Sequence, residues 1–122
     1  MVKATFLGHA AVQLEDGTHT ILIDPFITGN AQAKVSADEV EADFIIITHG
    51  HSDHLGDTVS IAKRTGAICI APNELAQWLG TQGCQFHPLG CGGAHSFPFG
   101  KVKFTIAHHS AGAGELGDQY VG

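Results

Sequence analysis

Cysteine is scarce in this sequence and is not spaced for cross-linking. The 122 residues contain three cysteines, Cys69, Cys84 and Cys91, and no CxxC pair. An odd number without that spacing argues against a disulfide framework and against a structural zinc knuckle. Cys69 lies inside the apolar run 67–71, so we expect it to be a small buried side chain.

Long apolar runs and basic clusters are also missing. No stretch approaches the roughly 20 continuous apolar residues that a membrane span needs, and the first 17 residues lack the apolar run of a signal peptide. The longest basic cluster is the pair Lys63 and Arg64, and the formal net charge is −6. Because nucleic-acid and anionic-membrane surfaces need several Lys or Arg, we expect neither partner. A cytoplasmic location is the default expectation.

Histidine, by contrast, is abundant. The chain has nine histidines, and several of them cluster, which indicates metal binding or acid–base chemistry. Apolar residues make up 43% of the sequence, so a packed core is expected rather than disorder. The length is suited to one small domain.

The apolar patterning predicts an α/β fold. Short runs rich in Val and Ile are typical of strands, and 3.6-residue periodicity is typical of helices. The sequence predicts strands at 2–7, 10–15, 20–23, 43–48, 67–71 and 85–89, helices at 57–65 and 74–79, and a hairpin of 96–99 with 101–107. Asn73 is the expected N-cap of the second helix. This order favours a mixed, largely buried sheet with helices on one face.

Four metal-binding side chains follow one of the predicted buried strands. They are His49, His51, Asp53 and His54, which directly follow the run 43–48. Loops at strand ends are frequent binding sites because a rigid sheet holds them in place. Imidazole and carboxylate groups suit zinc, iron or manganese, and the four donors can be divided between two ions. A merely solvated loop rarely gathers four such donors, so a metal site is the preferred interpretation.

This loop and three other segments carry a family resemblance. Residues 48–57, THGHSDHLGD, resemble the HxHxDH signature of the metallo-β-lactamase superfamily. Residues 6–11, 22–26 and 107–110 (FLGHAA, LIDPF and AHHS) resemble the small metal-dependent hydrolases of that superfamily. The resemblance covers nearly all of this chain but about half of the family domain, a four-layer αββα sandwich. It therefore implies one metallo-β-lactamase-like domain at 1–122, half of the sandwich, truncated at its C-terminal end.

The resemblance also implies a ligand set for a first metal ion. His49, His51 and a later histidine are expected to hold it, zinc being favoured over manganese or iron. The later ligand is expected to be His109, with His108 as the alternative, because alternation along a strand lets only one of the two face the site.

A second metal ion is only partly provided for. By the resemblance, Asp53 and His54 serve it, and Asp53 also acts in catalysis by orienting the nucleophile. The bridging aspartate and the final histidine ligand of the family are absent before Gly122. The sequence therefore predicts one or two divalent metal ions.

Two residues near the predicted site have open roles. Asp24 resembles the family's aspartate that steadies a metal-bound histidine, and a turn aspartate that caps the following loop is the alternative. His9 is placed by the resemblance at the rim of the site, in contact with substrate, and a hydrogen-bonded turn histidine is the alternative.

Other candidate residues are expected to be structural. Asp57 is predicted to be the N-cap of the helix at 57–65. His19, His87 and His95 have no donor residues nearby in sequence and are expected to be structural or surface residues.

The resemblance implies a metal-dependent hydrolase in which a metal-activated hydroxide attacks an ester, amide or phosphoester. The expected substrate is a small molecule, and thioesters remain open. The alternative is a non-catalytic, metal-binding half-domain that needs a second copy, as a homodimer, or a complementing C-terminal fragment.

Overall fold

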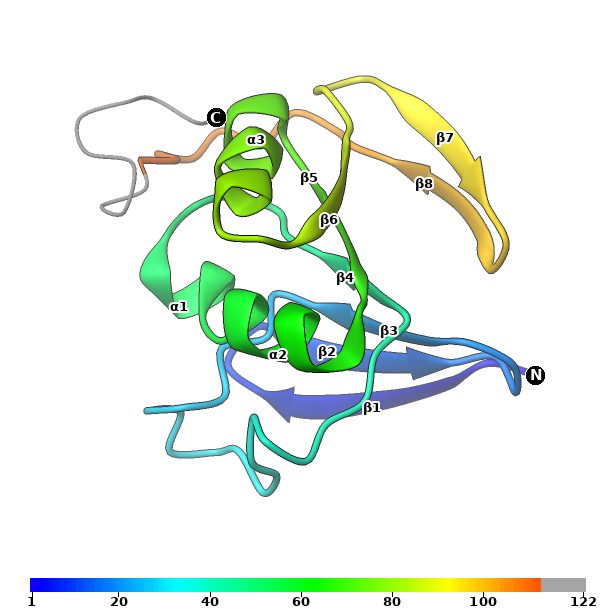
Figure 1. Ribbon diagram of the computed structural model, residues 1–122, viewed down its shortest axis with the longest axis vertical. Coiled ribbons are helices and arrows are strands. Elements are labelled where there is room, and N and C mark those ends of the chain that lie inside the picture. Colours follow the sequence, from blue (N-terminus) through cyan, green and yellow to red (C-terminus); the bar gives the residue numbers. More distant parts are fainter. Residues whose placement is uncertain (113–122) are drawn as a thin grey trace.

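The computed structural model describes residues 1–112, and a mixed sheet is its central feature (Figure 1). The sheet has six strands in the order β1-β2-β3-β4-β5-β6. The first three form an antiparallel meander, and β3 to β6 pair in parallel. The strands span β1 (Lys3–Gly8), β2 (Ala11–Glu15), β3 (Thr20–Ile23), β4 (Phe44–Ile46), β5 (Ile68–Ala71) and β6 (Gln85–Pro88).

The helices cover one face of this sheet. α2 (Thr58–Thr65) connects β4 to β5, α3 (Asn73–Thr81) connects β5 to β6, and the short α1 (Ser52–Leu55) precedes α2. Apolar residues of the helices, including Ile61, Leu75 and Leu79, pack against Leu22 and Ile45 of the sheet in the main core. The connections from β4 to β5 and from β5 to β6 each join parallel strands through a helix. Because such crossovers are right-handed, α2 and α3 lie on the same side of the sheet.

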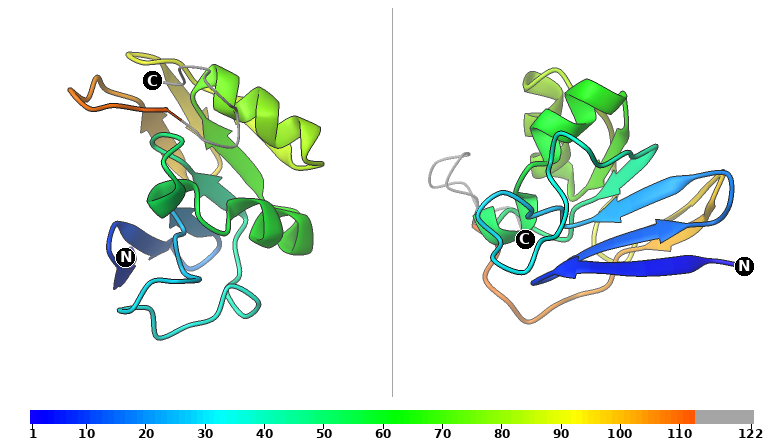
Figure 2. Two further views of the ribbon diagram at one scale, coloured as in Figure 1. Left: turned by 90° about the vertical axis from the view of Figure 1, so that its left-hand side faces the viewer. Right: turned by 90° about the horizontal axis from the view of Figure 1, so that it is seen from below.

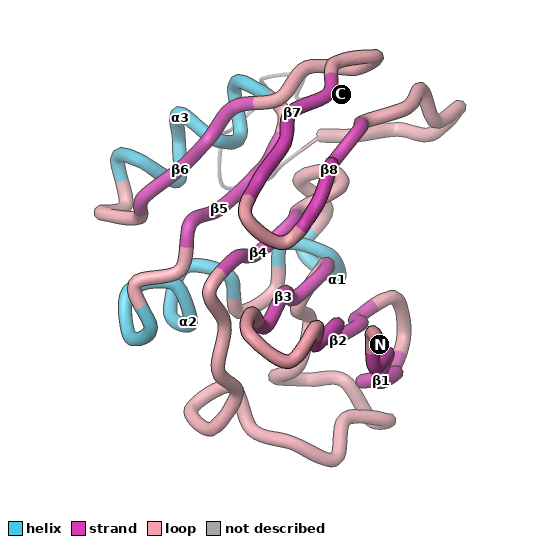
Figure 3. Tube along the Cα trace, turned by 90° about the vertical axis from the view of Figure 1, so that its right-hand side faces the viewer, coloured by secondary structure: helices cyan, strands magenta, loops and turns pink. Residues whose placement is uncertain are grey.

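A separate hairpin lies against the opposite face. It consists of β7 (Ala94–Phe97) and β8 (Gly100–Lys103), which pair with each other as a second, two-stranded sheet. Figure 2 (left view) and Figure 3 show the hairpin and the helices on opposite sides of the central sheet. Phe97 and Phe99 lie against Phe44 of β4, with ring centroids 5.9 and 4.7 Å from the Phe44 centroid.

Strict alternation explains why the central strands are apolar throughout. On β5, Cys69 belongs to the helix-side core, whereas Ile68 and Ile70 pack on the hairpin side. On β4, Ile45 faces the helices and Phe44 faces the hairpin. Because both faces are covered, every position of these strands is buried or partly buried against apolar neighbours.

The expected α/β architecture is confirmed, with several corrections to the element boundaries. α3 begins at Asn73 rather than after it, with Pro72 at the N-cap position and no capping hydrogen bond from a side chain. The hairpin strands begin earlier than expected, and β8 ends at Lys103 instead of continuing to residue 107. The turn of the hairpin lies at residues 98–99, just before the expected position, and Gly100 is the first residue of β8, where its φ of +143° suits glycine.

Among residues 1–112, no helix has the length and apolar character of a membrane-crossing segment.

Candidate metal centre

The histidine loop lies where β4 ends. The chain leaves the sheet after Ile46, Ile47 is fully buried, and the loop then turns into α1. Sequence alone predicts a polar loop here, but the backbone N–H groups of His54 and Leu55 donate to the carbonyl of His51 and form a helical turn. Leu55 is 3% exposed, so its side chain anchors the turn in the core and holds the polar residues at the surface.

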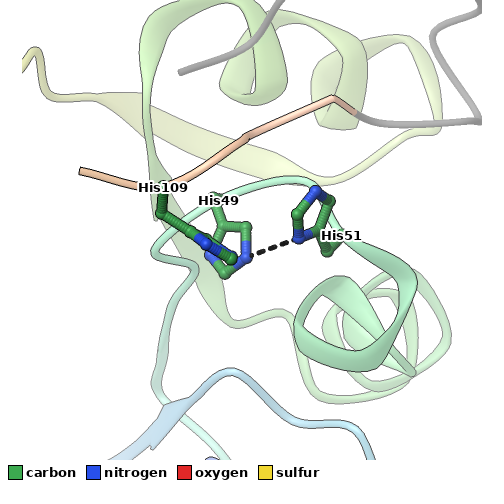
Figure 4. Close-up of side chains that lie close together, drawn as sticks. All are labelled: His49, His51 and His109. Carbon is green, nitrogen blue, oxygen red and sulfur yellow. Dashed lines mark hydrogen bonds between the residues drawn. The ribbon is translucent and has the colours of Figure 1, made fainter. Parts of the chain in front are cut away.

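Three imidazoles from distant parts of the chain converge at this point (Figure 4). The ring centroid of His109 lies 4.8 Å from that of His49 and 5.0 Å from that of His51. His49 Nε2 and His51 Nδ1 are 3.1 Å apart. One ring nitrogen of each of the three residues lies within 4.8 Å of the others, a spacing at which one ion can contact all three.

Asp24 controls the orientation of two of the histidines. It follows β3, its side chain is nearly fully buried, and its φ is +45°. Its Oδ1 accepts the Thr48 N–H at 2.8 Å, and its Oδ2 accepts the Thr48 hydroxyl at 2.7 Å. His54 Nδ1 lies 2.9 Å from the same Oδ2. Because a carboxylate oxygen accepts hydrogen bonds, the ring of His54 donates to Asp24 from Nδ1, and its Nε2 points away from this contact.

Thr48 extends this control to His49. The Thr48 hydroxyl donates its one proton to Asp24, so at the 2.9 Å contact with His49 Nδ1 it must be the acceptor. His49 therefore carries its proton on Nδ1 and presents an unprotonated Nε2 to the histidine cluster. A metal-binding histidine needs this tautomer, and hydrogen bonds of this kind fix it.

The pKa of His49 favours the same form. Burial lowers the pKa of its imidazole, and the neighbouring rings of His54 and His51 lower it further. A lowered pKa keeps the ring neutral near pH 7, and the neutral ring is the one that binds a metal ion.

A second group of donors lies on the β1–β2 side of the loop. His9, in the turn between β1 and β2, places its Nε2 2.9 Å from Asp53 Oδ2. His54 Nε2 lies 4.0 Å from the same oxygen. Partial burial raises the pKa of Asp53, but the hydrogen bond with His9 and the nearby His54 outweigh this effect and lower it overall. Asp53 is therefore an ionised carboxylate that faces two imidazoles.

The candidate residues thus form overlapping groups rather than one cluster. The donor atoms of His9, Asp53 and His54 lie within 4.8 Å of one another, and so do those of Asp24, His49 and His54. The set of His49, His51 and His109 fits a divalent ion by its chemistry, since each residue offers an imidazole nitrogen and such donors suit zinc.

His108 and His109 lie outside any strand, so alternation along a strand is the wrong criterion for choosing between them. His109 joins the cluster, and His108 belongs to none of the donor groups found in residues 1–112.

Asp57 differs from its expected role as a helix cap. It occupies the N-cap position of α2, but its side chain makes no capping hydrogen bond. Instead, its Oδ2 accepts the backbone N–H groups of Ile27 and Thr28, at 2.9 and 2.7 Å. The carboxylate therefore ties the loop after β3 to the start of α2.

The role of Thr48 in the site and the pairing of His87 with His95 outside it were not predicted. For Thr48, a hydroxyl directly before the first histidine of the loop could have indicated a hydrogen bond to that histidine. His87 of β6 and His95 of β7, expected to be structural or surface residues, have ring centroids 4.3 Å apart, and this pairing is not visible in the sequence.

Comparisons with known proteins show what this chain is similar to. A family profile described as "Beta-lactamase superfamily domain" matches residues 3–120. A UPF0173 metal-dependent hydrolase from Shouchella clausii is 54% identical over 121 residues, which is 98% of this chain and 53% of the relative. Another, from Geobacillus sp. strain WCH70, is 53% identical over 111 residues, 91% of this chain and 49% of the relative. The chain spans about half the length of these curated relatives.

Solved structures show the same fold. Igni18, a metallo hydrolase from the archaeon Ignicoccus hospitalis, matches with a TM-score of 0.83 and 30% identity over 98% of this chain and 53% of its own. CmlA, a diiron β-hydroxylase from Streptomyces venezuelae, matches with a TM-score of 0.62 over 78% of this chain and 22% of its own. At 24% identity, the likeness to CmlA shows the fold alone.

Proposed function

Because this chain belongs to the beta-lactamase superfamily, we propose that it forms the metal-binding half of a metal-dependent hydrolase of small molecules. The observation that carries the proposal is the convergence of His49 and His51, which follow β4, with His109, which follows the hairpin. The relatives named as metal-dependent hydrolases support it, since they match this chain over nearly its whole length.

The proposed ligands of the first ion are His49 through Nε2, His51 through Nδ1, and one ring nitrogen of His109. Zinc is the proposed ion because imidazole donors at this spacing suit it, and manganese and iron are the alternatives to test. A bound divalent ion supplies Lewis acidity, which lowers the pKa of a water molecule and polarises a substrate oxygen.

The carboxylate of Asp53 is the proposed general base. It is ionised and lies in the same loop as His49 and His51, so it can accept a proton from an attacking water molecule. His9 donates from Nε2 to Asp53 Oδ2 and so holds the carboxylate in place. An ester, amide or phosphoester is the proposed substrate class, because each presents an oxygen on which negative charge develops during attack by water.

Metal content per chain, measured by elemental analysis after zinc loading, is the first test of this proposal. We expect His109→Ala to lose most of the zinc that the wild-type protein retains through dialysis. His108→Ala is the matched control, because it removes an imidazole one residue away that belongs to none of the described donor groups. Equal zinc content in the two variants would contradict the ligand assignment.

Turnover of a panel of esters, amides and phosphoesters is the second test. We expect Asp53→Ala to lower kcat at least about a hundredfold, the usual effect of a general base. Unchanged turnover would remove Asp53 from the mechanism. Zinc binding without turnover of any substrate would instead favour a non-catalytic half-domain, and sedimentation would then show whether two copies pair.

A further inference from the structure

A pocket of about 560 Å³ opens beside the histidine cluster. It lies between the ends of three parallel strands and the segment that follows β8. Thr48 and His49 line it after β4, Pro72 after β5 and Cys91 after β6. Residues 103–107 and 109–111 form much of its wall. Its volume falls within the range of small-molecule binding sites in proteins.

The pocket shares its boundary with the proposed metal centre. His49 and His109 belong both to the histidine cluster and to the pocket lining. A molecule in the pocket therefore reaches the same two rings that would hold the ion. Because the pocket and the histidine cluster share these residues, the pocket is part of the same site and not an isolated depression of the surface.

The walls away from these histidines are mainly apolar. They include Pro72, Phe104, Ile106, Ala107 and Ala111. The side chain of Ile106 is 75% exposed, although it is large and apolar. Exposed apolar side chains that gather at a concave surface are characteristic of binding sites.

The charge of the pocket contrasts with that of the chain. The protein carries a formal net charge of −6, but no carboxylate is among the lining residues that the structure describes. Lys103 is the one formally charged residue among them. Such a lining favours a neutral or anionic molecule with an apolar body over a cation.

We propose that this pocket binds the apolar acyl group of a carboxylic ester, with the reacting carbonyl at the His49 and His109 end and Ile106 as a specificity-determining residue. The proposal rests on the proposed hydrolase function and names the substrate class for that same site. An acyl chain fits both the apolar walls and their position next to the metal centre. The carboxylate released by hydrolysis is also compatible with the lining, which has one cation and no described anion.

Binding can be tested without turnover, using metal-free protein and NMR of isotope-labelled methyl groups. Hexanoate is the probe, and acetate is the matched control because it has the same carboxylate without the chain. We expect hexanoate to shift the methyl signals of Ile106 and Ala107, and acetate to leave them in place. Equal shifts of these methyl signals with both acids, or no shift with either acid, would overturn the proposal. A pocket filled by another segment of the protein or by a second copy would overturn it as well.

Kinetics with p-nitrophenyl acetate and p-nitrophenyl hexanoate on zinc-loaded protein give the second test. We expect kcat/KM for p-nitrophenyl hexanoate to exceed that for p-nitrophenyl acetate by roughly tenfold or more, since each buried methylene contributes to binding. Ile106→Ser should remove most of this preference, whereas Val2→Ser, at another exposed apolar side chain that lies outside the pocket, should keep it. A preference that survives Ile106→Ser overturns the role of Ile106.

The two proposals fail in different ways. No turnover of either ester, with hexanoate still shifting the Ile106 methyl groups, would contradict the hydrolase function and leave the pocket as a site for apolar acids. Turnover of both esters at equal rates, with no response to hexanoate, would support the hydrolase function and overturn the pocket assignment.

Discussion

Thr48 is the residue through which a buried carboxylate acts on the histidine cluster. Its hydroxyl donates to Asp24 and accepts from His49. The Thr48 side chain therefore sets the tautomer of His49, its neighbour in sequence. Asp24 itself directly follows β3 and is nearly fully buried. The unprotonated His49 Nε2 is therefore prepared before any ligand arrives.

The first prediction concerns this hydroxyl. Thr48→Val keeps the branched shape but removes the hydrogen bonds to Asp24 and His49, so we expect zinc to bind about 10–100-fold more weakly, as is typical when the partners of metal ligands are removed. Isothermal titration calorimetry with zinc measures the change. Thr48→Ser retains the hydroxyl and should stay close to wild type. A weakening of equal size in both variants would show that the methyl group matters and the hydroxyl does not.

Residue types and spacing were enough to predict that the side chains of the loop at 49–54 lie together, whereas His109 and Asp24 were expected from the family resemblance. His49, His51 and Asp53 are adjacent in sequence, so their proximity follows from the loop itself. The contacts of Asp24 with Thr48 and His54 join residues 24 and 30 positions apart. Those contacts depend on the parallel pairing of β3 with β4, which no local pattern in the sequence reveals.

At the scale of elements, the loop after β3 and the turn between α1 and α2 are fitted closely together. Gly56 has φ +45°, and a Cβ added there would lie 2.5 Å from Phe26 Cα and 2.6 Å from the Pro25 carbonyl oxygen. The Asp57 N–H donates to that same carbonyl. Only a residue without a side chain allows this contact, which holds α1, with Asp53 and His54, against the loop that follows β3.

The second prediction follows from this contact. Gly56→Ala should lower the free energy of unfolding by about 1–3 kcal/mol, because it combines a strained φ with overlap against backbone atoms. Urea unfolding followed by circular dichroism measures the loss. Gly90→Ala is the control, since a Cβ there meets nothing within 4 Å and its φ lies outside the left-handed region. Equal losses in the two variants would remove the steric argument.

Strands buried on both faces were the elements that the sequence predicted well. β4 and β5 have apolar residues at every position because helices cover one side and the hairpin covers the other. The hairpin boundaries were wrong because they depend on Phe97 and Phe99 packing over Phe44, a contact between distant segments. α1 was missed because its residues are mostly polar, and Leu55 alone buries it.

At the scale of the whole molecule, the histidine cluster joins two parts of the fold. His49 and His51 come from the helix-covered sheet, whereas His109 follows the hairpin on the opposite face. A ligand held by all three would close a long stretch of chain that includes α2, β5, α3 and β6. Such a ligand binds the folded protein and not the unfolded chain, so it stabilises the fold by mass action.

The third prediction is that zinc raises the thermal unfolding midpoint and that EDTA reverses the rise. At a free zinc concentration a hundred times the Kd, the expected stabilisation is about 2.7 kcal/mol. Differential scanning calorimetry measures it. His109→Ala should lose most of the zinc-dependent shift, and His108→Ala should retain it. A full shift in the His109 variant would mean that the ion does not bridge the two faces.

The edge strand β6 affects whether a strand of another molecule can pair with this sheet. β6 ends at Pro88 and is the final strand of the sheet order in residues 1–112. The Leu89 N–H points inward and donates to the Ala71 carbonyl, so the preceding position points outward, where proline has no N–H to offer. An approaching strand would find a gap in the row of donors at that point. This margin of the sheet is therefore a poor template for edge-to-edge aggregation.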